Sequence, residues 1–303
     1  MFKKILICAF IIFLLKPPAH AAEEPANTDS GQQINDFSLS GYGEKGKKSW
    51  DVSGKSADIF NDVVKMNKVV GNMYGDDENI KLTSERGDFN KAEGKVHLQD
   101  NVVITTSSGA KLTTDSLDWD RKAQFVSTKD LVNIQKDGMT LVAIGARGET
   151  NLKTVALEKN VRLDIDQQTK GESGLTDEKN KIIITCDGPL EIDYEKNVAV
   201  FKNNVKVERP DSVIYSDKMD VFFIRSRESK AQDKKEEKKS SGIMSGSKID
   251  RIVARGNVKV TRGQNTSFSD EAVYSAADQK LILSGRPKLV IYSTEDLNAP
   301  VGN

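Results

Sequence analysis

The sequence predicts an all-β protein built from two similar modules. Three observations support this fold class: short stretches alternate apolar and polar residues, Gly, Asn and Asp are frequent beside only 7 prolines, and two strand patterns recur along the chain. Alternation with a period of two is typical of strands that have one apolar face, and Val, Ile and Thr favour strands. No comparable stretch has helical spacing, so we expect antiparallel strands joined by tight turns.

The first 21 residues have the composition of an export signal. Lys3 and Lys4 precede an unbroken apolar run, residues 5–15, and Ala19-His20-Ala21 supplies the small residues of a cleavage site. The run is shorter than the stretch of about 20 residues that a helix needs to cross a bilayer. We therefore expect cleavage after Ala21, followed by a disordered leader at 22–33; the alternative is that the segment is retained as a membrane anchor.

The first recurring pattern is a strand that opens with Asn-Val. It occurs at 101–104, 160–163, 204–207 and 257–260, each time after a short turn-like stretch. Successive side chains of a strand point to opposite faces, so the second and fourth residues of each pattern share one apolar face. Those residues are Val102, Ile104, Val161, Leu163, Val205, Val207, Val258 and Val260. We expect Lys206 and Lys259 on the opposite, hydrated face.

The second pattern has an apolar residue, an acid three positions later and a large residue four positions after the acid. It fits Leu82/Glu85/Phe89, Leu112/Asp115/Trp119 and Ile214/Asp217/Val221, and in part Ser267/Asp270/Tyr274 and Ile184/Asp187. After Asp187 the spacing of the last example is shifted by a residue or more, which indicates a β-bulge at Gly188-Pro189. Recurrence at about 20 to 25 residues is typical of stacked supersecondary units.

These patterns divide the chain into two modules, 34–165 and 182–293, followed by a tail at 294–303. The polar segment 166–181 between the modules is expected to be a linker. Residues 225–247 interrupt the second module with a mixed-charge run that has little to bury, and we expect a flexible insertion there.

Several kinds of chemistry are excluded or disfavoured. The chain has 45 basic and 45 acidic residues, so charge gives no reason to expect nucleic acid binding. After cleavage Cys186 is the single cysteine and His97 the single histidine, which rules out an intramolecular disulfide and disfavours a histidine-dependent catalytic triad. Asp164 and Asp166 share a strand face, but two carboxylates are a weak calcium signal. We expect no enzymatic activity, no cofactor and no metal site.

A glycine-rich stretch at 41–46 has the letters of a dinucleotide-binding loop. That loop needs a helix start after its last glycine to receive the pyrophosphate. Residues 47–52 instead have the pattern of a strand, so a hairpin turn explains the glycines better.

The repeats resemble the OstA-like proteins of lipopolysaccharide transport. The second module is similar to LptA at Tyr215-Ser216-Asp217, at residues 254–258, at 268–274 and at the ending 283–287. The first module is similar to LptC at Trp50, Ala57 and residues 82–90, 98–102, 109–117 and 126–128. The apparently cleavable signal and the fused second module both depart from a typical LptC.

The resemblance implies two twisted β-jelly-roll modules with an open apolar groove that holds the lipid A acyl chains of lipopolysaccharide. It implies a periplasmic place in a bridge between an inner-membrane ABC transporter complex and an outer-membrane translocon, with modules joined edge to edge and possible head-to-tail self-association. The edge strands expected to dock partners contain Phe37 and Leu39 at one end, and Leu289, Val290 and Ile291 at the other.

The residues themselves leave two alternatives open. The apolar faces of two opposed sheets form either a groove held open for a lipid or a sealed sandwich core, and the pattern is the same for both. In the second case the chain would be a structural or adhesive β-repeat protein of the cell envelope with no lipid ligand. An enzyme such as a glycan hydrolase would need a convergent carboxylate pair, which the repeats do not single out.

Overall fold

The computed structural model of the protein describes residues 32–43, 46–75, 78–149, 154–166, 181–225, 247–278 and 280–290. The expected signal, most of the leader, residues 167–180 of the linker, nearly all of the insertion and the tail lie outside the described residues. The regular elements within these ranges are all strands, which confirms the predicted fold class. No helix in the described part of the chain has the length and apolar character needed to cross a membrane.

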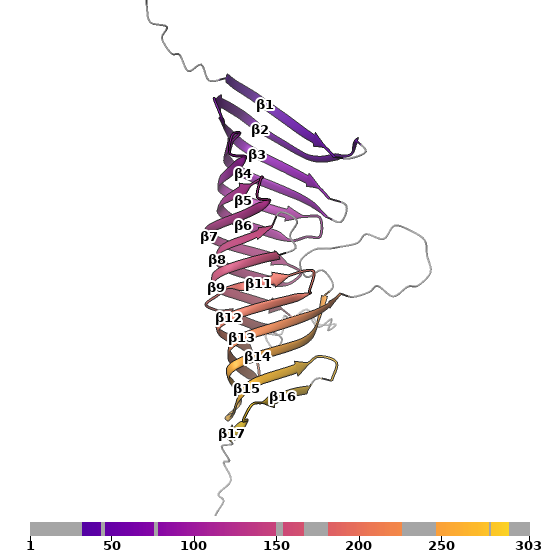
Figure 1. The fold of residues 1–303 in the computed structure, drawn as a ribbon, viewed down its shortest axis with the longest axis vertical. Coiled ribbons are helices and arrows are strands. Elements are labelled where there is room, and N and C mark those ends of the chain that lie inside the picture. The colour runs from indigo at the N-terminus through magenta and orange to yellow at the C-terminus, as the bar shows by residue number, and fades with distance from the viewer. Residues whose placement is uncertain are drawn as a thin grey trace, which may run out of the picture. The chain divides into compact units, whose positions relative to one another are not determined.

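Within the described residues, seventeen strands follow one another in chain order (Figure 1). They are β1 (Gln32–Tyr42), β2 (Lys48–Phe60), β3 (Val63–Tyr74), β4 (Asn79–Asn90), β5 (Lys95–Thr106), β6 (Lys111–Asp120), β7 (Phe125–Lys136), β8 (Met139–Glu149), β9 (Thr154–Asp166), β10 (Lys181–Cys186), β11 (Leu190–Asp193), β12 (Val198–Arg209), β13 (Ser212–Arg225), β14 (Ser247–Arg262), β15 (Asn265–Ser275), β16 (Lys280–Ser284) and β17 (Lys288–Val290).

Each strand pairs antiparallel with the next one along most of the chain, so the ladder follows sequence order. β10 and β11 both pair with β9 on one side and with β12 on the other, and together they form one interrupted strand. The interruption contains Gly188-Pro189, where the sequence predicts a bulge. Ile184 lies opposite Leu163, which means that the ladder passes from the first module into the second without a break.

The Asn-Val pattern marks the middle of a strand, and the expectation that it opens one is wrong. Asn203 and Asn204 have φ angles of 65° and 52°, and the register between β12 and β13 shifts between Lys202 and Val205. Asp100 and Asn101 in β5 have φ angles of 62° and 54° with a similar shift. Asparagine and aspartate tolerate this left-handed region better than other non-glycine residues. Two such residues in a row bend the strand, and we call this bend the corner.

The second pattern lies on the strand that follows each corner, and its residues pair with those beside the corner. The valine of one pattern lies opposite the hydroxyl residue that precedes the acid of the other, as in Val205 with Ser216 and Val258 with Ser269. The acid next to the hydroxyl residue holds the corner of the strand that follows it: Asn257 Nδ2 in β14 donates to Asp217 Oδ2 in β13 at 2.9 Å. A Cβ at Gly256 would lie 2.4 Å from the same carboxylate oxygen, so this corner requires glycine. The two repeats therefore form one cross-strand unit.

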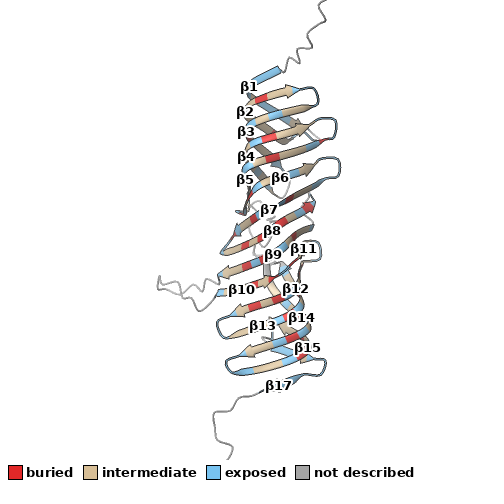
Figure 2. Cartoon of the chain, turned by 90° about the vertical axis from the view of Figure 1, so that its left-hand side faces the viewer, coloured by how far each residue is buried: buried red, intermediate tan, exposed pale blue. Residues whose placement is uncertain are grey.

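The core lies between the two halves of the bent strands. Figure 2 shows buried residues recurring in successive strands, beside intermediate and exposed ones. A large cluster joins β8 to β15 and includes Leu157 and Val161 from the first module with Phe201 and Met219 from the second. A smaller cluster in β3 to β6 is centred on Val69, Leu98, Val102 and Leu117.

Candidate functional site

The candidate site is the inner face, which we define as the apolar side of the strands that faces across the bend. All eight residues that the sequence assigns to the lipid face are on this side. Six are buried, namely Val102, Val161, Leu163, Val205, Val207 and Val258. Ile104 and Val260 are half-buried and pack against the edges of the two clusters.

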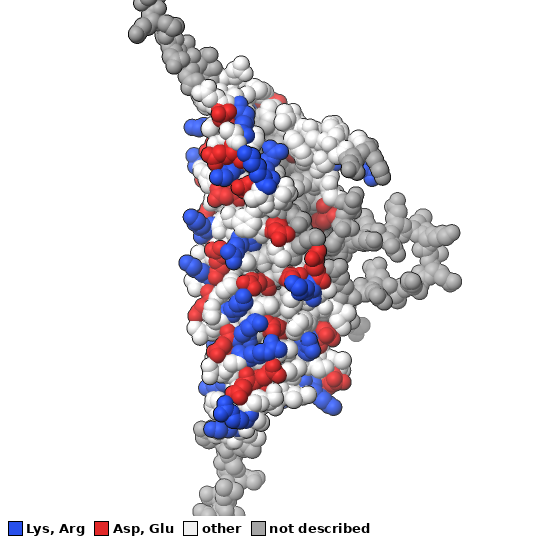
Figure 3. All heavy atoms as spheres, viewed as in Figure 1, with Lys and Arg blue, Asp and Glu red and all other residues white. Residues whose placement is uncertain are grey.

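The opposite side of the same strands is hydrated. Lys206 and Lys259 alternate with the inner valines, and their ammonium groups lie 5.9 Å and 5.7 Å from the centroid of the Tyr215 ring. Lys206 also forms an ion pair with Glu208 at 2.5 Å. Figure 3 shows basic and acidic residues interspersed over the face that it displays, in keeping with the balanced composition.

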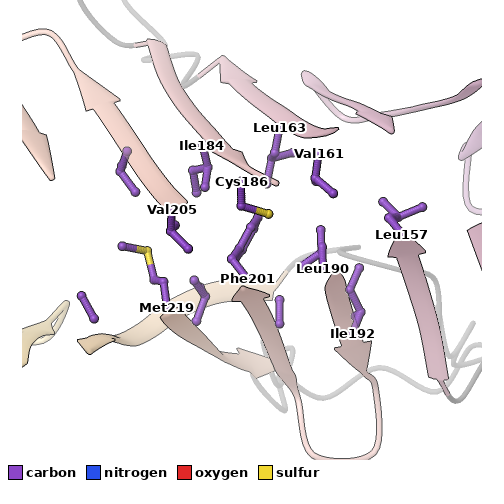
Figure 4. Close-up of a cluster of buried hydrophobic side chains, with 14 of the residues drawn as sticks. Leu157, Val161, Leu163, Ile184, Cys186, Leu190, Ile192, Phe201, Val205 and Met219 are labelled. Carbon is purple, nitrogen blue, oxygen red and sulfur yellow. The ribbon is translucent and has the colours of Figure 1, made fainter. Parts of the chain in front are cut away.

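The inner face has two walls that meet in the large cluster. One row crosses the sheet through Leu157, Leu190, Phe201 and Met219, which are successive cross-strand neighbours. Side chains of the other wall, such as Leu163 and Ile184, point toward this row in Figure 4. The walls therefore pack against each other across β8 to β14, as they would in a sandwich core.

A small cavity remains between the walls. It has a volume of about 30 Å³, and its lining includes Met139, Leu141, Leu157, Ile192 and Tyr194. A single water needs at least about 10 to 15 Å³ measured in this way, so the cavity is of water size. An acyl chain enters this part of the interior only if the walls separate.

Fewer inner-face residues are fully buried toward the N-terminal edge. Four residues form the small cluster, while neighbours such as Val52, Leu82 and Ile104 are only half-buried. At the edge itself Phe37 packs over Gly54, where a Cβ would lie 2.6 Å from the ring, and Leu39 is 62% exposed. The inner face is thus more accessible in β1 to β6 than in β8 to β14.

The residues expected to dock partners lie on the terminal strands. Phe37 and Leu39 belong to β1, which pairs with β2 and has no further neighbour among the described strands. Leu289 and Val290 belong to β17, which pairs with β15 alongside β16. Ile291 lies outside the described residues. The C-terminal edge is therefore shared by two short strands and does not consist of one long strand.

The side chains with catalytic or metal-binding potential are dispersed. His97 Nδ1 lies 2.6 Å from Asp118 Oδ1 on the neighbouring strand, and Asp164 forms an ion pair with Arg162. Cys186 is buried in the large cluster, and this burial raises the pKa of its thiol. Within the described ranges no three His, Cys, Asp or Glu side chains converge as a metal site would require.

The inner-face residues that the sequence interpretation missed include the row Leu157, Leu190, Phe201 and Met219, and also a lysine. Lys136 is buried at the end of β7, although a lysine at a strand end is normally assigned to the hydrated side. The signal is the alternation Val132, Ile134, Lys136, which places the lysine on the same side as two apolar residues.

Comparison with known proteins extends these observations. Residues 5–166 match the family model described as lipopolysaccharide-assembly, LptC-related, and residues 188–299 match that of the LptA/(LptD N-terminal domain) LPS transport protein. No curated protein matches the chain. Among solved structures, the chain is similar to LptH, the LptA homologous periplasmic component of the lipopolysaccharide transport device from Pseudomonas aeruginosa. That match has 12% identity and a TM-score of 0.28, and it covers 61% of this chain and 96% of that chain.

The two family matches occur in the order that the sequence patterns predict, an LptC-like module before an LptA-like one. The first match alone spans more than half of the chain. The chain therefore belongs to the LptC-related family of lipopolysaccharide-assembly proteins, which act in transport.

Proposed function

We propose that the protein covers the acyl chains of lipopolysaccharide on its inner face and passes the lipid between neighbours in a periplasmic bridge. The observation that carries this proposal is the continuity of the inner face. Because β9 pairs with β10, the apolar side of the LptC-like module runs directly into that of the LptA-like module. One chain then provides a single apolar path through both modules.

Lipid entry has a definite energetic requirement. Across β8 to β14 the walls contact each other, so an acyl chain must replace wall-to-wall contacts with wall-to-chain contacts. Removing one CH₂ from water is worth about 0.8 kcal/mol, so a chain of about a dozen carbons gains about 10 kcal/mol. That gain is available to offset opening of the walls. The more accessible β1 to β6 region is then the entry point for the chain.

Hand-over requires contact with neighbours, and both ends of the ladder support it. An edge strand presents unpaired backbone groups that a strand of another protein can extend. Leu39 at one edge and Leu289 at the other also expose inner-face side chains, so a docked neighbour would continue the apolar path as well as the ladder. Members of both matched families act beside the inner membrane or in the periplasm, which suits a bridge of this kind.

Photo-crosslinking tests the inner face directly. A photoreactive phenylalanine analogue in place of Val260, which is half-buried on the inner side, is expected to capture lipopolysaccharide in irradiated cells. The same residue in place of Lys259, exposed on the opposite side of β14, is expected to give no adduct. Adducts are detected by immunoblotting for lipopolysaccharide. Val205 is a poorer site because it is only 1% exposed, and a large side chain there would disturb the core.

A second matched pair, Ile104 and Val103 in β5, makes the same comparison in the LptC-like module. Equal labelling at the inner and outer positions of both pairs would contradict the proposed lipid face. Absence of any lipid adduct would favour the structural β-repeat alternative.

A further inference from the structure

Lys136 is a cation on the apolar inner face. It follows Val132 and Ile134 at alternate positions of β7; Val132 is buried, and Ile134 packs against the large cluster. Lys136 itself is only 6% exposed. Burying a charged group is costly unless it is paired, so a lysine at this position needs a reason beyond packing.

The partners of Lys136 come from two neighbouring turns. Its Nζ donates to Ser108 Oγ at 2.9 Å, and Ser108 lies in the turn between β5 and β6. The Ser108 hydroxyl in turn donates to Glu78 Oε1, and the Ser108 backbone N–H donates to the same oxygen at 3.3 Å. Glu78 is half-buried just before β4. The ammonium and the carboxylate are thus linked through a hydroxyl that a stronger acceptor can replace.

Lys136 also lines the water-sized cavity, where the two walls meet. Ile134 and Met139 come from the wall of Lys136, and Ile192 and Tyr194 come from the opposite one. Burial, and then the negative charge of Glu78, raises the pKa of the Tyr194 hydroxyl. A cation, an exchangeable acceptor and an apolar cavity therefore lie together beside the passage from β9 to β10.

We propose that Lys136 binds the anionic head group of an amphiphile of the phosphate-ester class, whose chain enters the interior between Met139 and Tyr194. This inference rests on the proposed function, in which the inner face covers acyl chains. A phosphate ester supplies several strong acceptors for the three N–H bonds of a lysine, and it replaces Ser108 and repels Glu78. The apolar lining selects for an attached chain, because a free anion gains nothing from it.

Two single-chain amphiphiles test the proposal on the full-length protein. Decyl phosphate and uncharged decyl maltoside, both below the concentration at which they form micelles, are titrated calorimetrically. The wild type is expected to bind decyl phosphate about tenfold more tightly, the difference that one charge-assisted hydrogen bond provides. Lys136→Met, which keeps an unbranched side chain, is expected to lose this preference and still bind the maltoside. Lys129→Met removes an exposed lysine from the same strand and is expected to change neither affinity.

Glu78→Gln tests the inference through an expected gain in affinity for decyl phosphate, where Lys136→Met is expected to give a loss. Removing the competing carboxylate is expected to raise the affinity for decyl phosphate and to leave that for the maltoside unchanged. If Lys136, Ser108 and Glu78 only fasten the turns together, this variant has no such selective effect, and that result would overturn the inference. If Lys136→Met melts at a much lower temperature than the wild type, the titration of Glu78→Gln still tests the inference.

The remaining outcomes separate the inference from the proposed function. Failure of both amphiphiles to bind the wild type would contradict the proposed function, and the inference would fall with it. Equal binding of both by the wild type, or a preference retained in Lys136→Met, would overturn only the role of Lys136. Inorganic phosphate at the same concentration is expected not to displace decyl phosphate. Displacement by it would mean that the site takes a free anion, which contradicts the amphiphile assignment.

Discussion

Replacing Phe201 with alanine is expected to lower the free energy of unfolding by about 3 to 5 kcal/mol. Phe201 is 2% exposed and lies between Leu190 and Met219 in the row that crosses the large cluster (Figure 4). Truncating a buried phenylalanine removes its transfer free energy and leaves a cavity that the surrounding walls fill only in part. Denaturant unfolding followed by circular dichroism measures the loss.

Phe125 provides the matched control, because it is 37% exposed at the start of β7. Phe125→Ala is expected to cost less than about 1 kcal/mol, in the range of substitutions away from the core. The large cluster includes Leu157 from the LptC-like module, so the Phe201→Ala loss should affect both modules together. Two separate unfolding transitions, of which the substitution shifts only one, would contradict a shared core.

The faces of the strands were predictable because burial follows the period of two. Val205 and Val207 are buried while Lys206 is not, as the alternation indicates. The corners were not predictable from the same pattern. Asn203 and Asn204 interrupt the alternation, so the next residues look like the start of a new strand. The carboxylate that holds such a corner lies on another strand, as Asp217 does for Asn257, and only pairing reveals it.

The side of the strand was predictable for the eight residues that alternate after each Asn-Val, but the row Leu157, Leu190, Phe201 and Met219 and the contact between the walls were not. Whether Leu163 and Phe201 enclose a groove or a core depends on how sharply the strands bend, and no local pattern encodes that angle. Lys136 was missed for a related reason. A lysine is assigned to the hydrated side unless the positions of Val132 and Ile134 are followed to the strand end. The partners that explain it, Ser108 and Glu78, come from distant turns.

Proline substitutions in β17 are expected to weaken docking of a neighbouring transport protein about tenfold without unfolding the chain. In an antiparallel pair, successive residues direct their backbone N–H groups alternately toward the partner strand and away from it. Of Leu289 and Val290, therefore, one donates toward β15 and the other toward the open edge. Proline at the outward position removes a donor that an added strand needs, and an unpaired group at such an interface costs about 1 to 3 kcal/mol. Biolayer interferometry against a purified neighbour of the same fold measures the change.

The pair of variants is informative because the two prolines act on different sides of the same strand. The outward variant is expected to keep wild-type stability and lose affinity for the neighbour. The inward variant is expected to weaken the pairing of β17 with β15 at the edge of the sheet, where all three β17 residues are exposed. Alanine at each position keeps the backbone donor and controls for the lost side chain. A partner that docks on β1, around Leu39, should bind every variant equally. If both proline variants bind the neighbour like the wild type, the added strand does not pair with β17, and β16 becomes the segment of this edge to test next, since it pairs with β15 beside it.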